Sequence, residues 1–247
     1  DLRDPKQYPK PIAACHWFLD TRMAGLHFPR IGDVAGPDKA YGAWWDRAEA
    51  QCRLGWRWTK DPRFAYVIKH FGAKGKDETA EEWAEIEKAA DTVKRAPWLD
   101  QRSRVVSQWF GLLETGIPED DFRFRRAAMV RIGQGWGHQH SDSLDLQLYA
   151  HGYPMTVDGG QRTGYSAPPD GTTRVHNLVE VDGRGWIGHS WVNALSDTEG
   201  ARYLRAEATP PVNHPNVKFH RRQVALVDVD EGQGGGKPFT PAMLRPQ

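Results

Sequence analysis

The spacing of apolar residues changes along the chain, and this change predicts the fold class. In the first half, apolar residues recur at helical spacing, as in residues 43–54. Asp61 precedes Pro62, which is the pattern of a helix N-cap followed by proline at the first helical position. Thr79 and Glu82 have the spacing of a capping box, with an apolar stripe behind them. The first half is therefore predicted to be helical.

From about Phe122 onward, apolar and polar residues alternate with the period of two that is typical of β-strands. We predict strands at 122–125, 144–149, 153–157, 175–183 and 222–229. Asp182 and Gly183 are expected to form a turn at the end of the fourth of these strands.

Helices that precede strands, without alternation between them, favour an α+β multidomain protein. We predict a helical segment over residues 1–121 and an antiparallel β-sandwich over residues 122–247. The predicted strands are too few for a complete sandwich, so this domain is expected to be incomplete at the C-terminus.

Composition excludes some classes of function. The 33 basic and 32 acidic residues give a net charge of +1, so nothing in the bulk charge favours a nucleic-acid partner. No apolar run approaches the roughly 18 residues of a membrane span, so no membrane partner is expected. The 11 tryptophans suit either a core or a sugar-stacking cleft. Cys15 and Cys52 leave open one bridge or two buried thiols.

A histidine cluster carries the candidate chemistry. His138 and His140 are two residues apart, so in a strand both imidazoles lie on the same side. Asp158 follows a predicted strand and precedes two glycines, and His176 lies in the next predicted strand. Two imidazoles and one carboxylate from separate strands suit Zn²⁺, which takes nitrogen and oxygen ligands. The sequence therefore predicts a metal and active site on β-strands.

A cupin-like arrangement is a second interpretation of the same region. His138, His140 and Asp145, followed by Gly152, imitate the first metal motif of cupins. That interpretation makes His138, His140, Asp145 and His176 the metal ligands of a metal-dependent enzyme. Cupins carry glutamate where Asp145 stands, and the spacing to His176 differs from theirs.

Three motifs in order resemble the heparinase II/III-like polysaccharide lyases. They are a G-x-x-H-x-H-x-D run at 135–142, a G-x-x-x-x-x-D-x-G run at 152–160, and a Thr/Arg-containing His-Asn strand that starts at 173 and ends in Asp-Gly at 183. The resemblance covers about residues 123–229, and the preceding segment resembles the end of the family's (α/α) toroid. It implies a partial toroid followed by an antiparallel β-sandwich.

The resemblance also implies an activity and a set of site residues. The activity is β-elimination on a uronic-acid-containing polysaccharide, and the alternative is a domain that binds such a polymer without cleaving it. His140, Asp158 and His176 are expected to bind a structural Zn²⁺. His138 and Tyr165 are the candidate catalytic residues, and the candidate substrate-binding residues are Gln139, Arg162 and Arg174.

The expected partner is an acidic polysaccharide, which implies a secreted or periplasmic protein. In the family, the principal catalytic tyrosine and its asparagine or histidine partner lie in the toroid. Residues 1–121 contain no convincing match to this pair. Other segments or chains of the same protein are therefore expected to complete the toroid.

Overall fold

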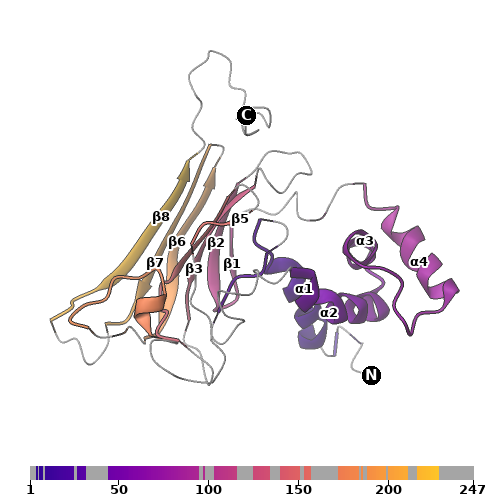
Figure 1. Cartoon of the computed structure of the whole chain (residues 1–247), viewed down its shortest axis with the longest axis horizontal. Coiled ribbons are helices and arrows are strands. Elements are labelled where there is room, and N and C mark those ends of the chain that lie inside the picture. The colour runs from indigo at the N-terminus through magenta and orange to yellow at the C-terminus, as the bar shows by residue number, and fades with distance from the viewer. Residues whose placement is uncertain are drawn as a thin grey trace, which may run out of the picture. The chain divides into compact units, whose positions relative to one another are not determined.

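A computed structural model shows four α-helices followed by eight β-strands in the part of the chain that it describes (Figure 1). The described residues are 4, 6–7, 9–24, 27–31, 44–94, 97, 103–115, 125–133, 140–150, 153–156, 172–183, 185, 188–198, 200–210 and 216–227. The chain divides into two compact units, one of residues 1–28 and 42–101 and one of residues 29–41 and 102–247. Helices before strands confirm the predicted fold class.

Three of the four helices of the first unit begin where the sequence predicts them. They are α1 (Pro9–Asp20), α2 (Trp44–Thr59), α3 (Pro62–Phe71) and α4 (Ala80–Ala90). Asp61 caps α3, because its Oδ1 accepts a hydrogen bond from the backbone N–H of Arg63 at 2.9 Å. Thr79 and Glu82 form the predicted capping box of α4 through reciprocal hydrogen bonds of 3.1 and 2.9 Å. Both caps are confirmed, whereas α1 was not predicted.

Both cysteines are buried free thiols in this unit, Cys15 on α1 and Cys52 on α2. Burial raises the pKa of Cys52 to about 12, so its thiol is protonated at neutral pH. The described part of the chain contains no helix long and apolar enough to cross a membrane.

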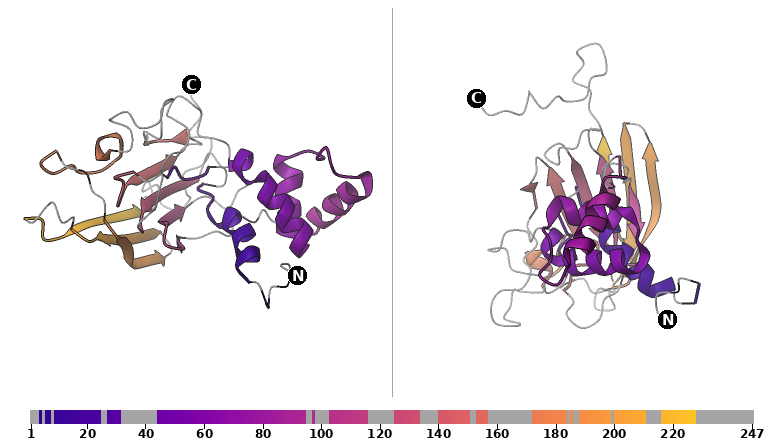
Figure 2. Two further views of the ribbon diagram at one scale, coloured as in Figure 1. Left: turned by 90° about the horizontal axis from the view of Figure 1, so that it is seen from below. Right: turned by 90° about the vertical axis from the view of Figure 1, so that its right-hand side faces the viewer.

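The second unit contains two antiparallel sheets. The first has the order β1-β2-β3-β4-β5 and the second the order β6-β7-β8, so each strand pairs with its sequence neighbour. The strands are β1 (Arg104–Val106), β2 (Phe110–Thr115), β3 (Arg126–Arg131), β4 (Leu146–Ala150), β5 (Tyr153–Pro154), β6 (Ser190–Thr198), β7 (Ala201–Ala208) and β8 (His220–Val227). In Figures 1 and 2, β6–β8 form a layer beside β1–β3.

The core of this unit lies between the two sheets. Leu113, Ala128 and Val130 of the first sheet belong to one buried cluster with Leu204 and Ala206 of β7. The close approach of the two sheets depends on Gly111, where an added Cβ would overlap the Leu204 side chain. This packing defines the inner faces of the sandwich.

Two sequence predictions differ from the structure. Residues 1–121 were predicted to be helical, but 104–106 and 110–115 are strands, and the unit that contains both sheets includes residues 102–121. All six residues of β2 are buried, so it lacks the alternation that reveals a strand. Residues 175–183 were predicted as a strand, but a short 3₁₀-helix, Thr173–Val175, precedes an irregular segment there. The predicted turn is present, with positive φ at Asp182 and Gly183.

The sandwich core gives a first prediction. Leu204→Ala is expected to lower the free energy of unfolding by about 2–5 kcal/mol, because it leaves a cavity where both sheets meet. Leu195→Ala is the matched control, since Leu195 pairs with Leu204 in register but is 38 % exposed. Chemical denaturation of both variants measures the difference. Equal losses would mean that Leu204 does not join the sheets.

Candidate functional site

His140 and His176 meet at the centre of the predicted site although 36 residues separate them. His140 Nδ1 lies 3.2 Å from His176 Nε2, and both residues are buried. His176 follows the 3₁₀-helix, and its backbone N–H donates to the Thr173 carbonyl at 3.1 Å. The structure thus brings together two of the three predicted metal ligands.

The hydrogen bond made by His176 Nδ1 determines whether His176 Nε2, the nitrogen that faces His140, carries a proton or a lone pair. His176 Nδ1 lies 2.7 Å from the Thr172 carbonyl oxygen, which only accepts hydrogen bonds, so Nδ1 carries the proton. A neutral His176 therefore presents the lone pair of Nε2 toward His140. Two nitrogen ligands at about 2.0–2.1 Å from a tetrahedral zinc lie about 3.3–3.4 Å apart. The 3.2 Å separation fits this geometry, and it also fits a hydrogen bond from His140 to His176.

Further hydrogen bonds join the chain around His140 to two later segments. Thr173 Oγ1 donates to the Ser141 carbonyl at 2.8 Å, beside the imidazole pair. Ser143 Oγ donates to the Gly188 carbonyl at 2.8 Å. A Cβ at Gly185 would stand 2.9 Å from Thr173 Oγ1, so glycine permits this close approach. The histidine pair is therefore part of a tightly connected loop cluster.

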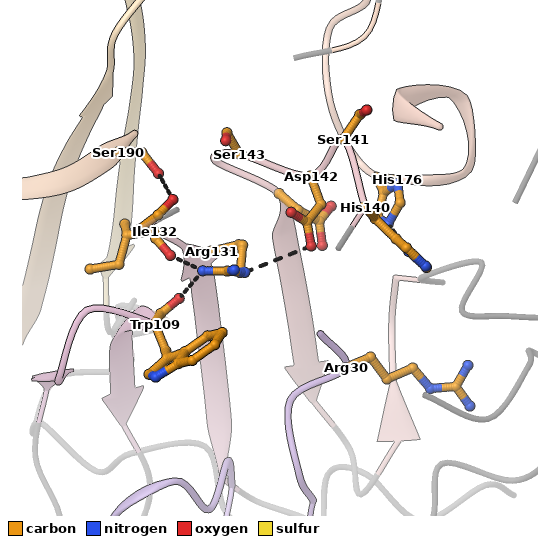
Figure 3. Close-up of polar contacts among 12 residues, drawn as sticks. Arg30, Trp109, Arg131, Ile132, His140, Ser141, Asp142, Ser143, His176 and Ser190 are labelled. Carbon is orange, nitrogen blue, oxygen red and sulfur yellow. Dashed lines mark hydrogen bonds and ion pairs between the residues drawn. The ribbon is translucent and has the colours of Figure 1, made fainter. Parts of the chain in front are cut away.

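A buried ion pair lies beside the two histidines (Figure 3). Asp142 Oδ2 is 3.7 Å from Arg131 Nε, and Arg131 Nη1 donates to the Trp109 carbonyl at 3.0 Å. Burial raises the pKa of Asp142, whereas its electrostatic interactions with Arg131, His176 and His140 act to lower it. Burial also lowers the pKa of Arg131. Asp142 thus links β3 to the segment that carries His140.

Asp145 is buried and accepts hydrogen bonds from its own chain. Its Oδ1 accepts from the Asn177 backbone N–H at 2.7 Å, and its Oδ2 accepts from Gln147 Nε2 at 3.2 Å. Among the residues that the structure describes, no three His, Cys, Asp or Glu side chains form a metal-binding group. Both carboxylate oxygens of Asp145 thus accept hydrogen bonds within the chain.

The other predicted site residues divide into one that is described and five that are not. Arg174 is exposed, and its Nε donates to both carboxylate oxygens of Glu180 at 3.0 and 2.9 Å. An acidic substrate group would compete with Glu180 for this guanidinium. The remaining predicted residues lie outside the described residues: His138, Gln139, Asp158, Arg162 and Tyr165.

Sequence reasoning missed the roles of Arg131 and Thr172. Arg131 ends β3, which begins after the strand predicted at 122–125, and a buried arginine has no local sequence signal. Thr172 acts through its backbone carbonyl, which any residue supplies. The motif did contain Asp142, and its place two residues after His140 was the available signal.

Comparison with solved structures identifies the fold. The heparinase III-BT4657 gene product matches with a TM-score of 0.60 and 17 % identity, over 91 % of this chain and 31 % of that one. Heparan sulfate lyase HepC from Pedobacter heparinus matches with a TM-score of 0.55 and 16 % identity, over 85 % of this chain and 29 % of that one. No protein-family model and no curated protein matches the chain.

These matches extend over the helical region and the sandwich. The chain has a heparinase-like fold, with a partial helical region followed by antiparallel sheets. It spans about a third of the length of the structures that it matches.

Proposed function

We propose that this chain is part of a polysaccharide lyase that cleaves a uronic-acid-containing polymer by β-elimination. The observation that carries the proposal is the His140–His176 pair within a heparinase-like fold. Residues 134–139 directly precede His140 in the sequence. Residues 157–171 directly precede Thr172, whose carbonyl contacts His176. These two segments contain the predicted catalytic residues His138 and Tyr165.

The reaction requires a base, an acid and a neutraliser of negative charge. A base removes the proton from C5, the C4–O4 bond breaks, and a C4–C5 double bond forms. The acid protonates the departing O4 oxygen. The C5 proton is weakly acidic because it is next to the carboxylate, so donors or cations must stabilise the developing enolate.

We assign these roles to residues of the two segments. His138 acts as the base or neutralises the substrate carboxylate, and Tyr165 contributes proton transfer or contacts the substrate. Histidine and tyrosine suit these roles because burial and neighbouring charge tune their pKa values. Arg162 and Arg174 bind acidic groups, since a guanidinium pairs with a carboxylate through two hydrogen bonds. Gln139 completes the proposed substrate contacts.

We propose that His140, Asp158 and His176 hold a structural Zn²⁺. The two donors that the structure describes support this proposal, because the paired imidazole nitrogens of His140 and His176 have ligand spacing and the Thr172 carbonyl orients the His176 ring. When bound, the zinc would hold the histidine-rich segment in place without activating water.

The remaining partners follow from the substrate class. An acidic polysaccharide is large and charged, so its degradation requires a secreted or periplasmic enzyme. Residues 1–121 contain no match to the family's toroid tyrosine and its partner, so other segments or chains of the protein supply them. If none does, the sandwich binds the polymer without cleaving it.

The direct test is ultraviolet absorbance of the unsaturated product. We expect the full-length protein to generate this signal with at least one of four polymer types: heparin-like, chondroitin-like, alginate and ulvan-type. Absence of signal with all four would contradict the lyase proposal. Measurable affinity for one of them without product would instead support the binding-only function.

A further inference from the structure

The outer face of the three-stranded sheet presents an ordered set of aromatic and charged side chains. Since Leu204 and Ala206 point into the core, the alternate residues of β7 point outward. The register places Trp191 opposite Glu207, and Glu207 opposite Arg221. The residues that define this face are Trp191, Tyr203, Arg205, Glu207 and Arg221, together with Asn193, which lies at a register shift and accepts a hydrogen bond from Arg205.

Polar contacts across the strands hold the two guanidinium groups of this face in place. Arg221 Nε donates to Glu207 Oε1 at 2.6 Å, and Arg205 Nε donates to Asn193 Oδ1 at 2.9 Å. Hydrogen bonds from Asn193 and from Arg221 lower the pKa of Glu207, so its carboxylate is ionised. Because both arginines make these contacts through Nε, each can direct its four Nη donors to a ligand.

Aromatic rings flank these guanidinium groups at one end of the face. Trp191 is 39 % exposed and stacks on the exposed His189, with ring centroids 5.7 Å apart. Phe219 is 68 % exposed and lies under the Arg221 guanidinium, whose central carbon is 5.3 Å from the ring centroid. One strand separates Trp191 from Arg221, which corresponds to about 10 Å across the sheet.

A sheet face that meets only water has polar side chains and needs no exposed aromatic rings. Here, the exposed rings of Trp191 and Phe219 accompany two guanidinium groups and one carboxylate. Aromatic rings have an apolar surface that can cover the carbon face of a sugar, and arginine pairs with carboxylate or sulfate through two hydrogen bonds. Because contacts within the sheet already hold Arg205 and Arg221, these side chains lose little conformational freedom when a ligand binds.

We propose that the outer face of β6–β8 binds the acidic polysaccharide at a second site, in addition to the site around His138. The class of ligand rests on the proposed function, because an acidic polymer is the substrate proposed there. Charge complementarity with Arg205 and Arg221 selects an acidic polymer over a neutral one. A second site of this kind would hold long chains on the enzyme.

Equilibrium binding of heparin-like, chondroitin-like and alginate polymers to the full-length protein tests the proposal. The His138→Ala background prevents cleavage during the measurement, and binding is readable even if the wild-type protein cleaves nothing. Trp191→Ala combined with Arg221→Gln is expected to weaken binding of the acidic polymer that binds best by about tenfold or more. A neutral polymer such as dextran should bind more weakly than that acidic polymer, and raising the salt concentration should reduce the difference.

The matched control combines Tyr153→Ala with Arg57→Gln, since Tyr153 is 71 % exposed and Arg57 is an exposed residue of α2. This control is expected to bind the polymer unchanged. If the first double variant does not fold, Phe219→Ala with Arg205→Gln replaces it, with the same expected loss.

Two outcomes would overturn the second site: equal affinity of the surface variant and the control, or equal binding of neutral and acidic polymers. If the surface variant loses affinity while the wild-type protein forms no unsaturated product from any polymer, the second site stands and the proposed lyase activity fails. If product forms but the surface variant binds normally, the lyase stands and the second site fails.

Discussion

Replacement of His138 by alanine is expected to lower turnover of a uronate polymer by about 10²–10⁴-fold, the usual contribution of a positioned acid or base. The reason is that His138 is the proposed base or carboxylate neutraliser, and alanine can neither accept the C5 proton nor carry charge. Initial rates of ultraviolet absorbance at several substrate concentrations separate kcat from KM. We expect the loss mainly in kcat, because the interaction develops in the transition state.

A histidine elsewhere provides the control for this substitution. His70 is exposed on α3, stacks on Tyr66 and is not among the proposed site residues, so His70→Ala removes an imidazole that has no proposed role in the reaction. His70→Ala should retain wild-type turnover, and both variants should unfold at wild-type temperature. A His138→Ala variant with wild-type kcat would exclude His138 from the proton transfers.

The second large effect concerns the metal. The purified protein is expected to contain one zinc per chain, measured by elemental mass spectrometry. His176→Ala should reduce zinc affinity by more than the roughly 10–100-fold caused by loss of an outer-shell partner, because it removes a proposed ligand. Asp158→Ala should also lose zinc and lower the unfolding temperature. Treatment of the wild-type protein with a chelator should lower that temperature in the same direction.

Asp145 separates the two interpretations of the metal site. Asp145→Asn keeps an oxygen that accepts from the Asn177 N–H, so it tests ligation with limited damage to the fold. Under the lyase proposal this variant retains zinc. Loss of zinc from Asp145→Asn together with retention by Asp158→Ala would instead establish the cupin-like ligand set. Retention by His176→Ala would exclude both interpretations.

Local interactions explain which elements could be predicted. The caps at Asp61 and Thr79 are hydrogen bonds within three residues, so their residue types and spacing suffice to recognise them. Strand β4 alternates between buried and partly buried residues, and so its strand pattern is visible. Strand β8 alternates between partly buried and exposed residues and was predicted for the same reason.

Tertiary burial explains the elements that were missed. β2 is buried along its whole length, so its apolar residues do not alternate. β6 has a register shift between Val192 and Ala194, which interrupts its period of two. β7 does alternate, but its inward positions include Arg202, which pairs with Asp197 at 3.3 Å. A charged residue on the inner face obscures the apolar pattern.

The sequence by itself determined that helices precede strands, where two helices are capped, and the residue types of the histidine cluster. These depend on contacts between near neighbours and on side-chain chemistry, which spacing along the chain reveals. Only the tertiary structure decided that His140 faces His176 and that Asp142 pairs with Arg131. It also decided that Asp145 accepts a hydrogen bond from the Asn177 backbone N–H. The physical reason is that each of these contacts forms between segments far apart along the chain or depends on side-chain direction after the sheets have packed.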